Sequence, residues 1–375
     1  MINDRKKNVL FISRSYFDDS PIATRHASYI NYLKKRSNLT ILNITKKLQK
    51  ENKTGIIRKI MNKCMRKLPL LPDSDILVLN RYKRKIKDLF KNNQYNIVLI
   101  GILPFSFLYL TKYIKNINSD IKIIVDMTDP ISANMYFSID NDNKSKSFKN
   151  RFMINYEKKY MKFVDVLTVL NEEIRQYYLK RFNNIRKIIV IEQGIEEDII
   201  IANTSNSTAP EKLNLIYAGN FYKYYREPFE LYKSIDKSKL NLMLIVYGSF
   251  KKCFIPPNKS MFYYGGRIPR EKLKWMYTKA HIIVFIDNKD TIQVPGKILE
   301  ILALNKPILF IYYNSNSPTI KIVKKYKGIH LTRNHCDEIN HTINRIIQIN
   351  RFNYDRNMSD YHWNNLFNKL NEYIN

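Results

Sequence analysis

The segment VPGKILEILALNKPIL, residues 294–309, combines residue types that suit a phosphorylated ligand. Pro295 has a fixed helical φ and no N–H, which predicts the first position of a helix. Gly296 lets a ligand approach the backbone, and the free amides of a first helical turn attract an anion such as phosphate. Glu300 follows about one turn later, and its carboxylate can accept hydrogen bonds from two hydroxyls, as a ribose offers. The segment therefore predicts a site for a diphosphate and a ribose.

The elements that position this segment follow from the apolar pattern around it. An apolar run at 281–286 predicts a strand, and the polar stretch 287–293 predicts a loop. A short helix at 296–304 and a strand at 307–311 are expected next. The segment thus stands after the carboxyl end of a predicted strand, where parallel α/β sheets bind their ligands.

The same alternation of apolar runs and amphipathic stretches predicts an α/β fold with two doubly wound, Rossmann-like domains. In the N-terminal half we expect helices such as 22–35 and 105–116, and strands at 8–13, 39–44, 97–102, 121–126, 164–170 and 187–192. In the C-terminal half we expect helices that begin at 228, 270, 296 and 319, and strands at 213–218, 242–247, 261–264, 281–286 and 307–311. The carboxyl ends of both sheets are expected to face one interdomain cleft.

Composition gives the domain boundaries. The polar stretch 201–210, rich in Asn, Ser and Thr, predicts a linker. The expected domains are therefore 1–200 and 201–352. Residues 353–375 are expected to form a C-terminal helix that packs back on the N-terminal domain, with an apolar side made of Tyr354, Tyr361, Trp363, Leu366, Phe367 and Leu370.

Charge and cysteine content narrow the class of protein. The 375 residues are 45% hydrophobic, and the formal net charge of +31 favours nucleic acid, acidic lipids or phosphorylated substrates as partners. Cys64, Cys253 and Cys336 are far apart, so no CxxC site is present and a reducing cytoplasm is expected. The longest apolar run, 97–110, is too short to span a membrane and is interrupted by Pro104. We expect neither a membrane span nor a secretory signal.

Seven further segments, in this order, support a family resemblance: residues 15–36, LPDSDILVLNRY at 71–82, VDMTDP at 125–130, residues 157–174, IVIEQGIEED at 189–198, LIYAGNFYKYYREPFELYKSI at 215–235 and GGRIPREKLKWMYTKAHIIVF at 265–285. Together with the VPGK segment they resemble GT-B glycosyltransferases of the large group 1, family-4-like class, of the bacterial surface polysaccharide type. The resemblance extends over nearly the whole chain.

The resemblance implies transfer of a sugar from a nucleotide-diphosphate-sugar donor to a hydroxyl of a glycan acceptor. It implies a retaining, metal-independent hexosyltransferase of polysaccharide biosynthesis (capsule, O-antigen or exopolysaccharide), which needs no cofactor beyond the nucleotide sugar. It makes residues 1–200 the acceptor domain and residues 201–352 the donor domain. The resemblance also implies a polyprenyl-linked acceptor and a cytoplasmic location. Peripheral attachment to the inner face of the cell membrane is an open alternative.

By position in these motifs, the resemblance assigns roles to residues of the donor domain. Arg226 matches a basic residue on the donor's phosphates, and Glu300 matches the glutamate that binds the ribose. Pro295, Gly296 and Lys297 match the helix start under the diphosphate and sugar. The other expected nucleotide-binding residues are Gly219, Gly266, Arg267 and Ile268. The expected catalytic residues are Asp129, Arg226 and Glu300.

One position departs from the family pattern and keeps other functions open. Ile292 stands where the family often has a second glutamate, which contacts the donor sugar, and Asp290 and Gln293 are the polar residues beside it. A non-catalytic or epimerase-type GT-B protein is therefore an alternative. The net charge also allows a basic nucleic-acid-binding protein, but the chain has no zinc knuckle, RNP-like strand or GxxG clamp, so no specific nucleic acid is expected.

Four residues of the first domain have both a structural and a chemical interpretation. Asp126 and Asp129 end a predicted strand, and each suits an acceptor-side role or a turn cap. Arg25, near the start of a predicted helix, suits a phosphate contact or the helix surface. His26 beside it is a weaker candidate for chemistry.

Two further segments concern metals and membranes. Asp140 and Asp142 form a D-x-D pattern in a polar stretch with no strand before it, and the histidines are scattered, so no metal site is expected. The segment from Lys46 to Lys67 alternates basic and apolar residues. This pattern is equally typical of an interfacial helix on an anionic inner-membrane surface and of a helix packed on the first domain.

Overall fold

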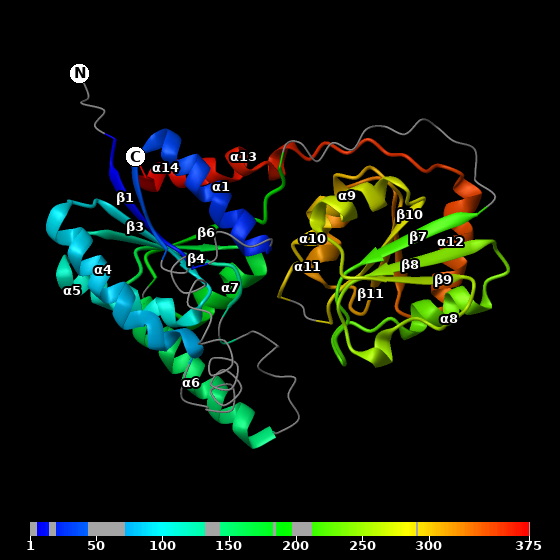
Figure 1. Cartoon of the computed structure of the whole chain (residues 1–375), viewed down its shortest axis with the longest axis horizontal. Helices are drawn as coiled ribbons and strands as arrows, with labels where there is room; N and C mark the ends of the chain where they lie inside the picture. The colour runs from blue at the N-terminus through cyan, green and yellow to red at the C-terminus, as the bar shows by residue number, and fades with distance from the viewer. Residues whose placement is uncertain are drawn as a thin grey trace. The chain divides into compact units, whose positions relative to one another are not determined.

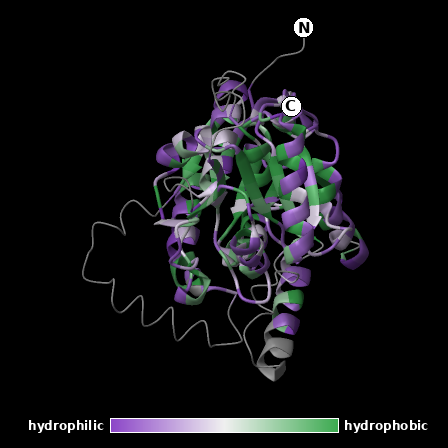
Figure 2. Cartoon of the chain, turned by 90° about the vertical axis from the view of Figure 1, so that its right-hand side faces the viewer, coloured by the Kyte–Doolittle hydropathy of each residue, from purple (hydrophilic) through white to green (hydrophobic). Residues whose placement is uncertain are grey.

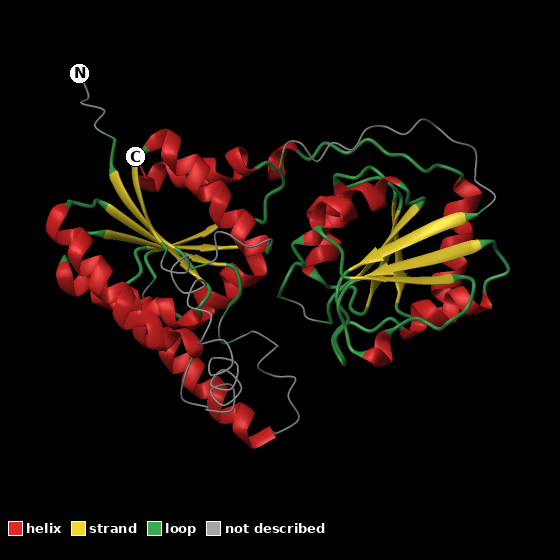
Figure 3. Cartoon of the chain, viewed as in Figure 1, coloured by secondary structure: helices red, strands yellow, loops and turns green. Residues whose placement is uncertain are grey.

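A computed structural model describes residues 6–14, 20–43, 72–130, 132, 143–182, 185–196, 212–289 and 292–374. The chain forms two compact units, the first made of Met1–Gln193 with Trp363–Asn375 and the second of Gly194–His362. Each unit contains one six-stranded sheet in which all neighbouring strands run parallel (Figure 3). The predicted α/β architecture with two doubly wound halves is confirmed.

The sheet of the first unit has the strand order β2-β1-β3-β4-β5-β6. Its central strand β3 reads IVLIGI and is buried at every position, because helices cover both faces of a parallel sheet. This continuous apolar run explains why the sequence predicts the bounds of β3 correctly. The strands are β1 (Asn8–Ile12), β2 (Asn38–Leu42), β3 (Ile97–Ile102), β4 (Lys122–Met127), β5 (Val166–Val169) and β6 (Lys187–Val190).

Helices lie on both faces of this first sheet (Figure 1). Helix α1 (Pro21–Arg36) begins where the Ser20 side chain accepts a hydrogen bond from the Ala23 N–H, with Pro21 in the first turn. Its apolar side packs with α13 (Trp363–Phe367) over the sheet. The other long helices of the unit are α4 (Leu79–Asn92), α5 (Tyr109–Ile117), α6 (Asn143–Met161) and α7 (Glu172–Arg181).

The sheet of the second unit has the order β12-β11-β10-β7-β8-β9. The predicted strands at 213–218 and 242–247 have the observed bounds, because each is a largely apolar run between polar loops, with Asn214 as the one polar residue in the first. Strand β12 was not predicted, because polar residues interrupt its sequence IHLTR. The strands are β7 (Leu213–Ala218), β8 (Leu242–Tyr247), β9 (Phe262–Gly266), β10 (Ile282–Ile286), β11 (Ile308–Tyr312) and β12 (Ile329–Arg333).

Two apolar clusters cover the two faces of the second sheet, one under α9, α10 and α11 and the other under α8 and α12. Figure 2 shows the hydrophobic strands in the interior and hydrophilic residues on the outer sides of the helices. The helices are α8 (Phe229–Lys237), α9 (Arg270–Thr278), α10 (Lys297–Leu302), α11 (Pro318–Val323) and α12 (Cys336–Ile349). None of the helices in the described part of the chain is both long and apolar enough to cross a bilayer.

The C-terminal segment is not the single helix that the sequence predicts. Residues 351–358 lack helical structure, and only short turns follow, in η6 (Ser359–Tyr361), α13, η7 (Asn368–Leu370) and α14 (Asn371–Ile374). The physical reason is Arg356, whose buried guanidinium donates hydrogen bonds to three carbonyl oxygens of the second unit, at 2.8–3.0 Å: Leu302, Lys306 and Lys327. These bonds hold the segment along the unit, and α13 then packs on α1 in the first unit.

The buried His330 predicts a loss of stability in acid. It lies in β12 and is 5% exposed, and burial, together with the charges of Arg345 and Arg356, lowers its pKa to about 4. The unfolded chain binds this proton below about pH 6.5, whereas the folded chain binds it only near pH 4. Stability is therefore full above pH 6.5 and falls as the pH drops toward 4. After allowance for solvent screening, the loss between pH 7 and pH 4.5 is about 2 kcal/mol.

Urea unfolding at the two pH values tests this prediction. His330→Gln removes the titrating group and is expected to reduce the loss of unfolding free energy in acid. His341→Gln, on the exposed side of α12, is the matched control and should behave like the unmodified protein. An equal loss in the His330 variant and in the unmodified protein would show that other groups cause the acid sensitivity.

Candidate functional site

The second unit places two candidate residues at the topological switch point of its sheet. Strands β7 and β10 are neighbours, but the chain continues from β7 to β8 on one side and from β10 to β11 on the other. Parallel α/β sheets bind ligands where the two following loops diverge, at the carboxyl ends of the strands. Arg226 follows β7 and Asn288 follows β10, so both lie at this edge.

A tight turn after β7 presents Arg226. Tyr222 and Arg226 exchange two backbone hydrogen bonds of 2.8 and 2.9 Å, and Tyr224 between them has a left-handed φ of 64°. The N–H of Glu227 donates to the Tyr313 hydroxyl at 2.9 Å, and the Glu227 carbonyl lies 3.2 Å from the same hydroxyl. The backbone on both sides of Arg226 is therefore fixed.

The Arg226 guanidinium keeps its charge in a half-buried position. Its Nη2 donates to Oδ1 of Asn288, and its buried Nε has no hydrogen-bond partner. Burial acts to lower the pKa of Arg226, but Tyr217, which also contributes a hydrogen bond, Tyr225 and Asp287 together raise it. Because the amide of Asn288 is neutral, its hydrogen bond does not cancel the positive charge.

The buried carboxylate of Asp287, which acts on the pKa of Arg226, is held by two hydroxyl groups. The Ser317 hydroxyl donates to Oδ2 of Asp287 at 2.5 Å, and the Thr319 hydroxyl donates to Oδ1 at 3.0 Å. Burial raises the pKa of Asp287, which these hydrogen bonds oppose. Among the described residues, no carboxylate forms an ion pair with Arg226.

A second set of charged side chains lies in the same unit as Arg226. It consists of Lys297, Glu300 and Arg270. Arg270 Nη2 donates to Oε1 of Glu300 at 2.7 Å, and both side chains are partly exposed. Desolvation lowers the pKa of Lys297, Glu300 raises it, and Arg226 and Arg270 lower it further, but the side chain is exposed, so we expect the effect of desolvation to be small. Lys297 and Glu300 are three residues apart on α10, so their side chains lie on one face of the helix, and the effect of Arg226 on the pKa of Lys297 indicates that Arg226 lies nearby. The predicted residues Arg226, Lys297 and Glu300 are thus brought into one neighbourhood.

The helix that carries Glu300 begins later and ends earlier than predicted. Gly296 is its N-cap and α10 covers only Lys297–Leu302, so Pro295 precedes the helix instead of opening it. The Pro295 carbonyl still accepts from the Ile298 N–H at 3.0 Å, which tightens the entry. A helix of six residues has a small dipole, so the side chains of this group are the stronger source of positive charge.

Glycines line the carboxyl ends of three neighbouring strands. Gly219 follows β7, Gly248 follows β8, and Gly266 ends β9. A Cβ on Gly248 would lie 2.0 Å from the carbonyl oxygen of Gly219, so only glycine allows these strand ends to come together. Gly266 has φ of 64° and open space where a side chain would stand. The exposed Arg267 and the half-buried Ile268 follow it, beside this open edge.

Ile292 stands where the motif resemblance implies a glutamate, and Gln293 is the polar residue that follows it. Ile292 is half-buried, and Oε1 of Gln293 accepts a hydrogen bond of 3.4 Å from the Tyr225 hydroxyl. Gln293 therefore lies beside the turn that carries Arg226. Asp290, the other polar residue near this position in the sequence, lies outside the described residues.

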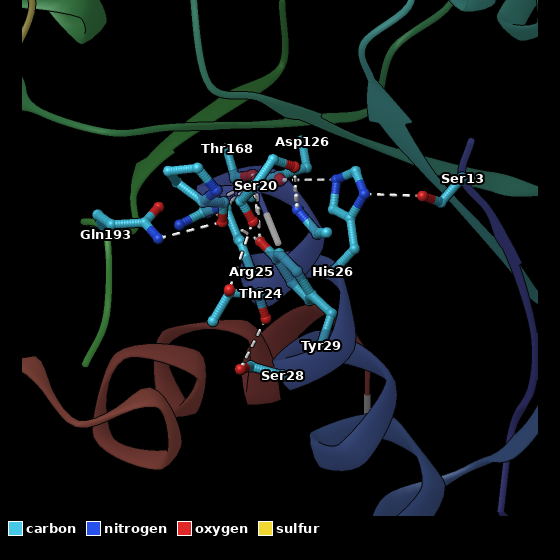
Figure 4. A network of polar contacts seen from close by, with 12 residues as sticks. Ser13, Ser20, Thr24, Arg25, His26, Ser28, Tyr29, Asp126, Thr168 and Gln193 are labelled. Atoms are coloured by element: carbon cyan, nitrogen blue, oxygen red, sulfur yellow. Dashed lines mark hydrogen bonds and ion pairs between the residues drawn. The ribbon is translucent and has the colours of Figure 1, made fainter. Parts of the chain in front are cut away.

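In the first unit, the polar residues near the switch point between β1 and β3 form a buried network (Figure 4). Arg25 Nε and Nη2 donate to the two oxygens of Asp126 at 2.9 and 2.7 Å, and both side chains are fully buried. Thr168 and Tyr29 donate to the same carboxylate at 2.6 and 3.1 Å. Burial acts to raise the pKa of Asp126, but Arg25 outweighs it and the pKa is lowered.

This network corrects the expectation that Arg25 contacts a phosphate. Its charge is neutralised by Asp126, and its Nη1 donates to the Glu192 carbonyl at 2.8 Å, so it joins α1 to the ends of two strands. His26 is also buried, between the Ser13 hydroxyl at 2.7 Å and Asp126 at 3.8 Å. Arg25 and Asp126 therefore have a structural role.

Asp129 lies in the first unit, just after β4, and is half-buried. The charged group around Glu300 belongs to the second unit, so the predicted site residues divide between the two units. Within the described residues, no three His, Cys, Asp or Glu side chains form a group that could hold a metal ion. Asp140, Asp142 and the segment from Lys46 to Lys67 lie outside the described residues.

No protein-family model and no curated protein matches the chain, but solved structures match it over nearly its whole length. Sucrose-phosphate synthase from Thermosynechococcus elongatus has a TM-score of 0.64 at 10% identity, over 98% of both chains. HepE from Anabaena, in complex with UDP and glucose, has a TM-score of 0.58 at 8% identity, over 98% of this chain and 95% of its own. A UDP-N-acetylglucosamine 2-epimerase has a TM-score of 0.54 at 11% identity, over 98% and 96%.

The chain has the GT-B fold. The resemblance predicted from the sequence motifs is thereby confirmed for the fold, and identities this low establish no more than that.

Within the GT-B fold, two residues of the candidate site were not predicted from the sequence. Asn288 lies two residues after the apolar strand β10, which is the signal that could have identified it. Arg270 is the first residue of α9 and lies in the motif at 265–285. The sequence separation of Arg270 and Glu300 does not show that the two side chains meet.

Proposed function

We propose that this protein is a glycosyltransferase that moves a sugar from a nucleotide-diphosphate sugar to a hydroxyl of a glycan acceptor. The observation that carries the proposal is the group of three cations, Arg226, Arg270 and Lys297, around Glu300 at the ligand-binding edge of the second sheet. Arg226 forms no ion pair with a carboxylate among the described residues, and one carboxylate serves the other two cations, which suits a ligand with two adjacent phosphates.

Each residue has a distinct part in the proposed reaction. Arg226 and Lys297 stabilise the negative charge that develops on the diphosphate as the bond to the sugar breaks. Glu300, oriented by Arg270, accepts hydrogen bonds from the ribose hydroxyls with the lone pairs that Arg270 leaves free. The glycine-lined ends of β7, β8 and β9 give the nucleoside a close approach to the backbone. Asp129, in the first unit, is the proposed contact for the acceptor hydroxyl.

The finer parts of the proposal rest on the motif resemblance. They are retention of configuration, independence from metal, a lipid-linked acceptor and a role in bacterial cell-surface polysaccharide synthesis. The uncompensated cations support metal independence, because they supply the positive charge that a metal would otherwise provide. The similarity to HepE, which was solved with UDP and glucose, supports a nucleotide-sugar donor.

Thermal unfolding with UDP, GDP, ADP, dTDP and CMP tests the donor site. A ligand of the folded state raises the melting temperature, so one diphosphate nucleotide is expected to give a clear shift. Glu300→Ala removes the ribose contact and is expected to weaken binding by roughly tenfold, since a hydrogen bond to a charged group contributes about 1.5–3 kcal/mol. Glu271→Ala, an exposed glutamate of α9, is the matched control and should bind normally.

Other results would point to other functions. A shift with RNA and with none of the nucleotides would contradict the proposal and favour a nucleic-acid-binding protein. The second candidate is an epimerase-type enzyme, because a UDP-N-acetylglucosamine 2-epimerase shares the fold and Ile292 replaces the expected glutamate. Conversion of the sugar to its epimer without any acceptor, with or without release of the nucleoside diphosphate to water, would favour that candidate.

A further inference from the structure

Arg25 and Arg226, which lie near the strand ends of the two units, differ in how their charge is balanced. Arg25 in the first unit donates to both oxygens of Asp126, so its charge is neutralised within the protein. Arg226 in the second unit donates to the uncharged amide oxygen of Asn288. A guanidinium held by a neutral partner keeps a full charge for an incoming anion. The first arrangement stabilises the fold, and the second leaves a charge available.

The neighbouring carboxylate is kept from neutralising Arg226. Asp287 precedes Asn288 in the same loop and affects the pKa of Arg226, so it lies close to the guanidinium. Both of its oxygens accept hydrogen bonds from hydroxyls near the start of α11, those of Ser317 and Thr319. In this loop the Asn288 amide therefore contacts Arg226, and the Asp287 carboxylate contacts the start of α11.

The Arg226 guanidinium also has unused hydrogen-bonding capacity. Its buried Nε has no hydrogen-bond partner, and an unpaired buried donor is unfavourable for the folded protein. A group that leaves such a donor unpaired in the free protein usually has a functional reason. A phosphate oxygen bound beside the Asn288 contact would satisfy that donor.

We propose that Asn288 is a positioning residue that fixes the Arg226 guanidinium, with its charge uncompensated, for the diphosphate of the donor. This inference rests on the proposed function. In this inference, the neutral amide of Asn288 leaves the charge of Arg226 uncompensated. The hydroxyls of Ser317 and Thr319 have the same effect, because they hold the Asp287 carboxylate. A carboxylate in place of the Asn288 amide would pair with Arg226 and compete with the diphosphate.

The experiment compares Asn288→Asp and Asn288→Ala with the unmodified protein. Calorimetric titration measures the affinity for UDP, GDP and ADP and for uridine, guanosine and adenosine. Asn288→Asp has nearly the same shape as the native residue and is expected to weaken binding of the diphosphate about tenfold or more. Binding of the matching nucleoside should change less than about twofold, since no phosphate contact is involved, and the melting temperature without ligand should be maintained or raised. Asn288→Ala should weaken diphosphate binding less than Asn288→Asp does.

Asn316→Asp is the matched control, because it adds the same charge at an exposed position between β11 and α11. Equal diphosphate affinity in Asn288→Asp, Asn316→Asp and the unmodified protein would overturn this inference and leave the proposed function intact. Equal losses of nucleoside and diphosphate binding, with a lower melting temperature, would show a purely structural role and would also overturn it. If the unmodified protein binds none of the diphosphates, the proposed function itself fails.

Discussion

Asp126→Asn is expected to destabilise the first unit by about 3–5 kcal/mol, because removal of one partner of a buried ion pair leaves the other charge uncompensated. Arg25 has no exposed surface and donates to both oxygens of Asp126. An asparagine can still accept from Thr168 and Tyr29, but it cannot balance the guanidinium. The network joins α1 to β4 and β5, so the loss extends to the packing of the sheet.

Urea unfolding followed by tryptophan fluorescence measures this loss, because Trp363 packs in the same unit with its indole ring 6.0 Å from the Arg25 guanidinium carbon. Asp120→Asn is the matched control, since Asp120 is exposed just before the same strand. It should change the unfolding free energy by less than about 0.5 kcal/mol. A loss below about 1 kcal/mol in Asp126→Asn would mean that water reaches Arg25 and that the pair is less isolated than its burial indicates.

The elements that sequence reasoning predicted best are those in which one local pattern decides the structure. Strand β3 is an unbroken apolar run, and α1 has a serine cap followed by Pro21. The prediction of a single C-terminal helix was wrong for the opposite reason. Its apolar residues suit a helix, but they divide between the cores of two units, and Arg356 fixes the stretch between them through distant carbonyl groups. No local pattern encodes such contacts.

The candidate site shows the same limit. The order of elements placed the segment that carries Glu300 after the carboxyl end of a strand, and the motif resemblance pointed to Arg226. It could not show that Arg25 pairs with Asp126, which is 101 positions away, or that Arg226 reaches Asn288, which is 62 positions away. These pairs decide which arginine keeps its charge for a ligand. The fold class was therefore predictable from the sequence, whereas the division between structural and available charges required the structure.

Arg226→Ala is expected to reduce turnover of the nucleotide sugar by about 10²–10³-fold, the effect typical of removing one preorganised group that stabilises developing charge. The turn that carries Arg226 is fixed by Tyr222 and Tyr313, so the guanidinium needs little rearrangement when the diphosphate begins to leave. Arg226→Lys keeps the charge but loses the planar arrangement of donors, and we expect a smaller loss. Arg333→Ala, which removes a charge from an exposed position at the end of β12, should have turnover close to that of the unmodified protein.

Steady-state release of the nucleoside diphosphate gives kcat and KM for these variants and separates two roles of Arg226. A fall in kcat with little change in KM means that the guanidinium acts mainly on the transition state, as expected for a group that balances the leaving diphosphate. An unchanged kcat with a raised KM would contradict that role, because it would show that Arg226 binds the ground state and the transition state equally. The stabilising charge would then have to come from Lys297, the cation at the start of the helix that carries Glu300.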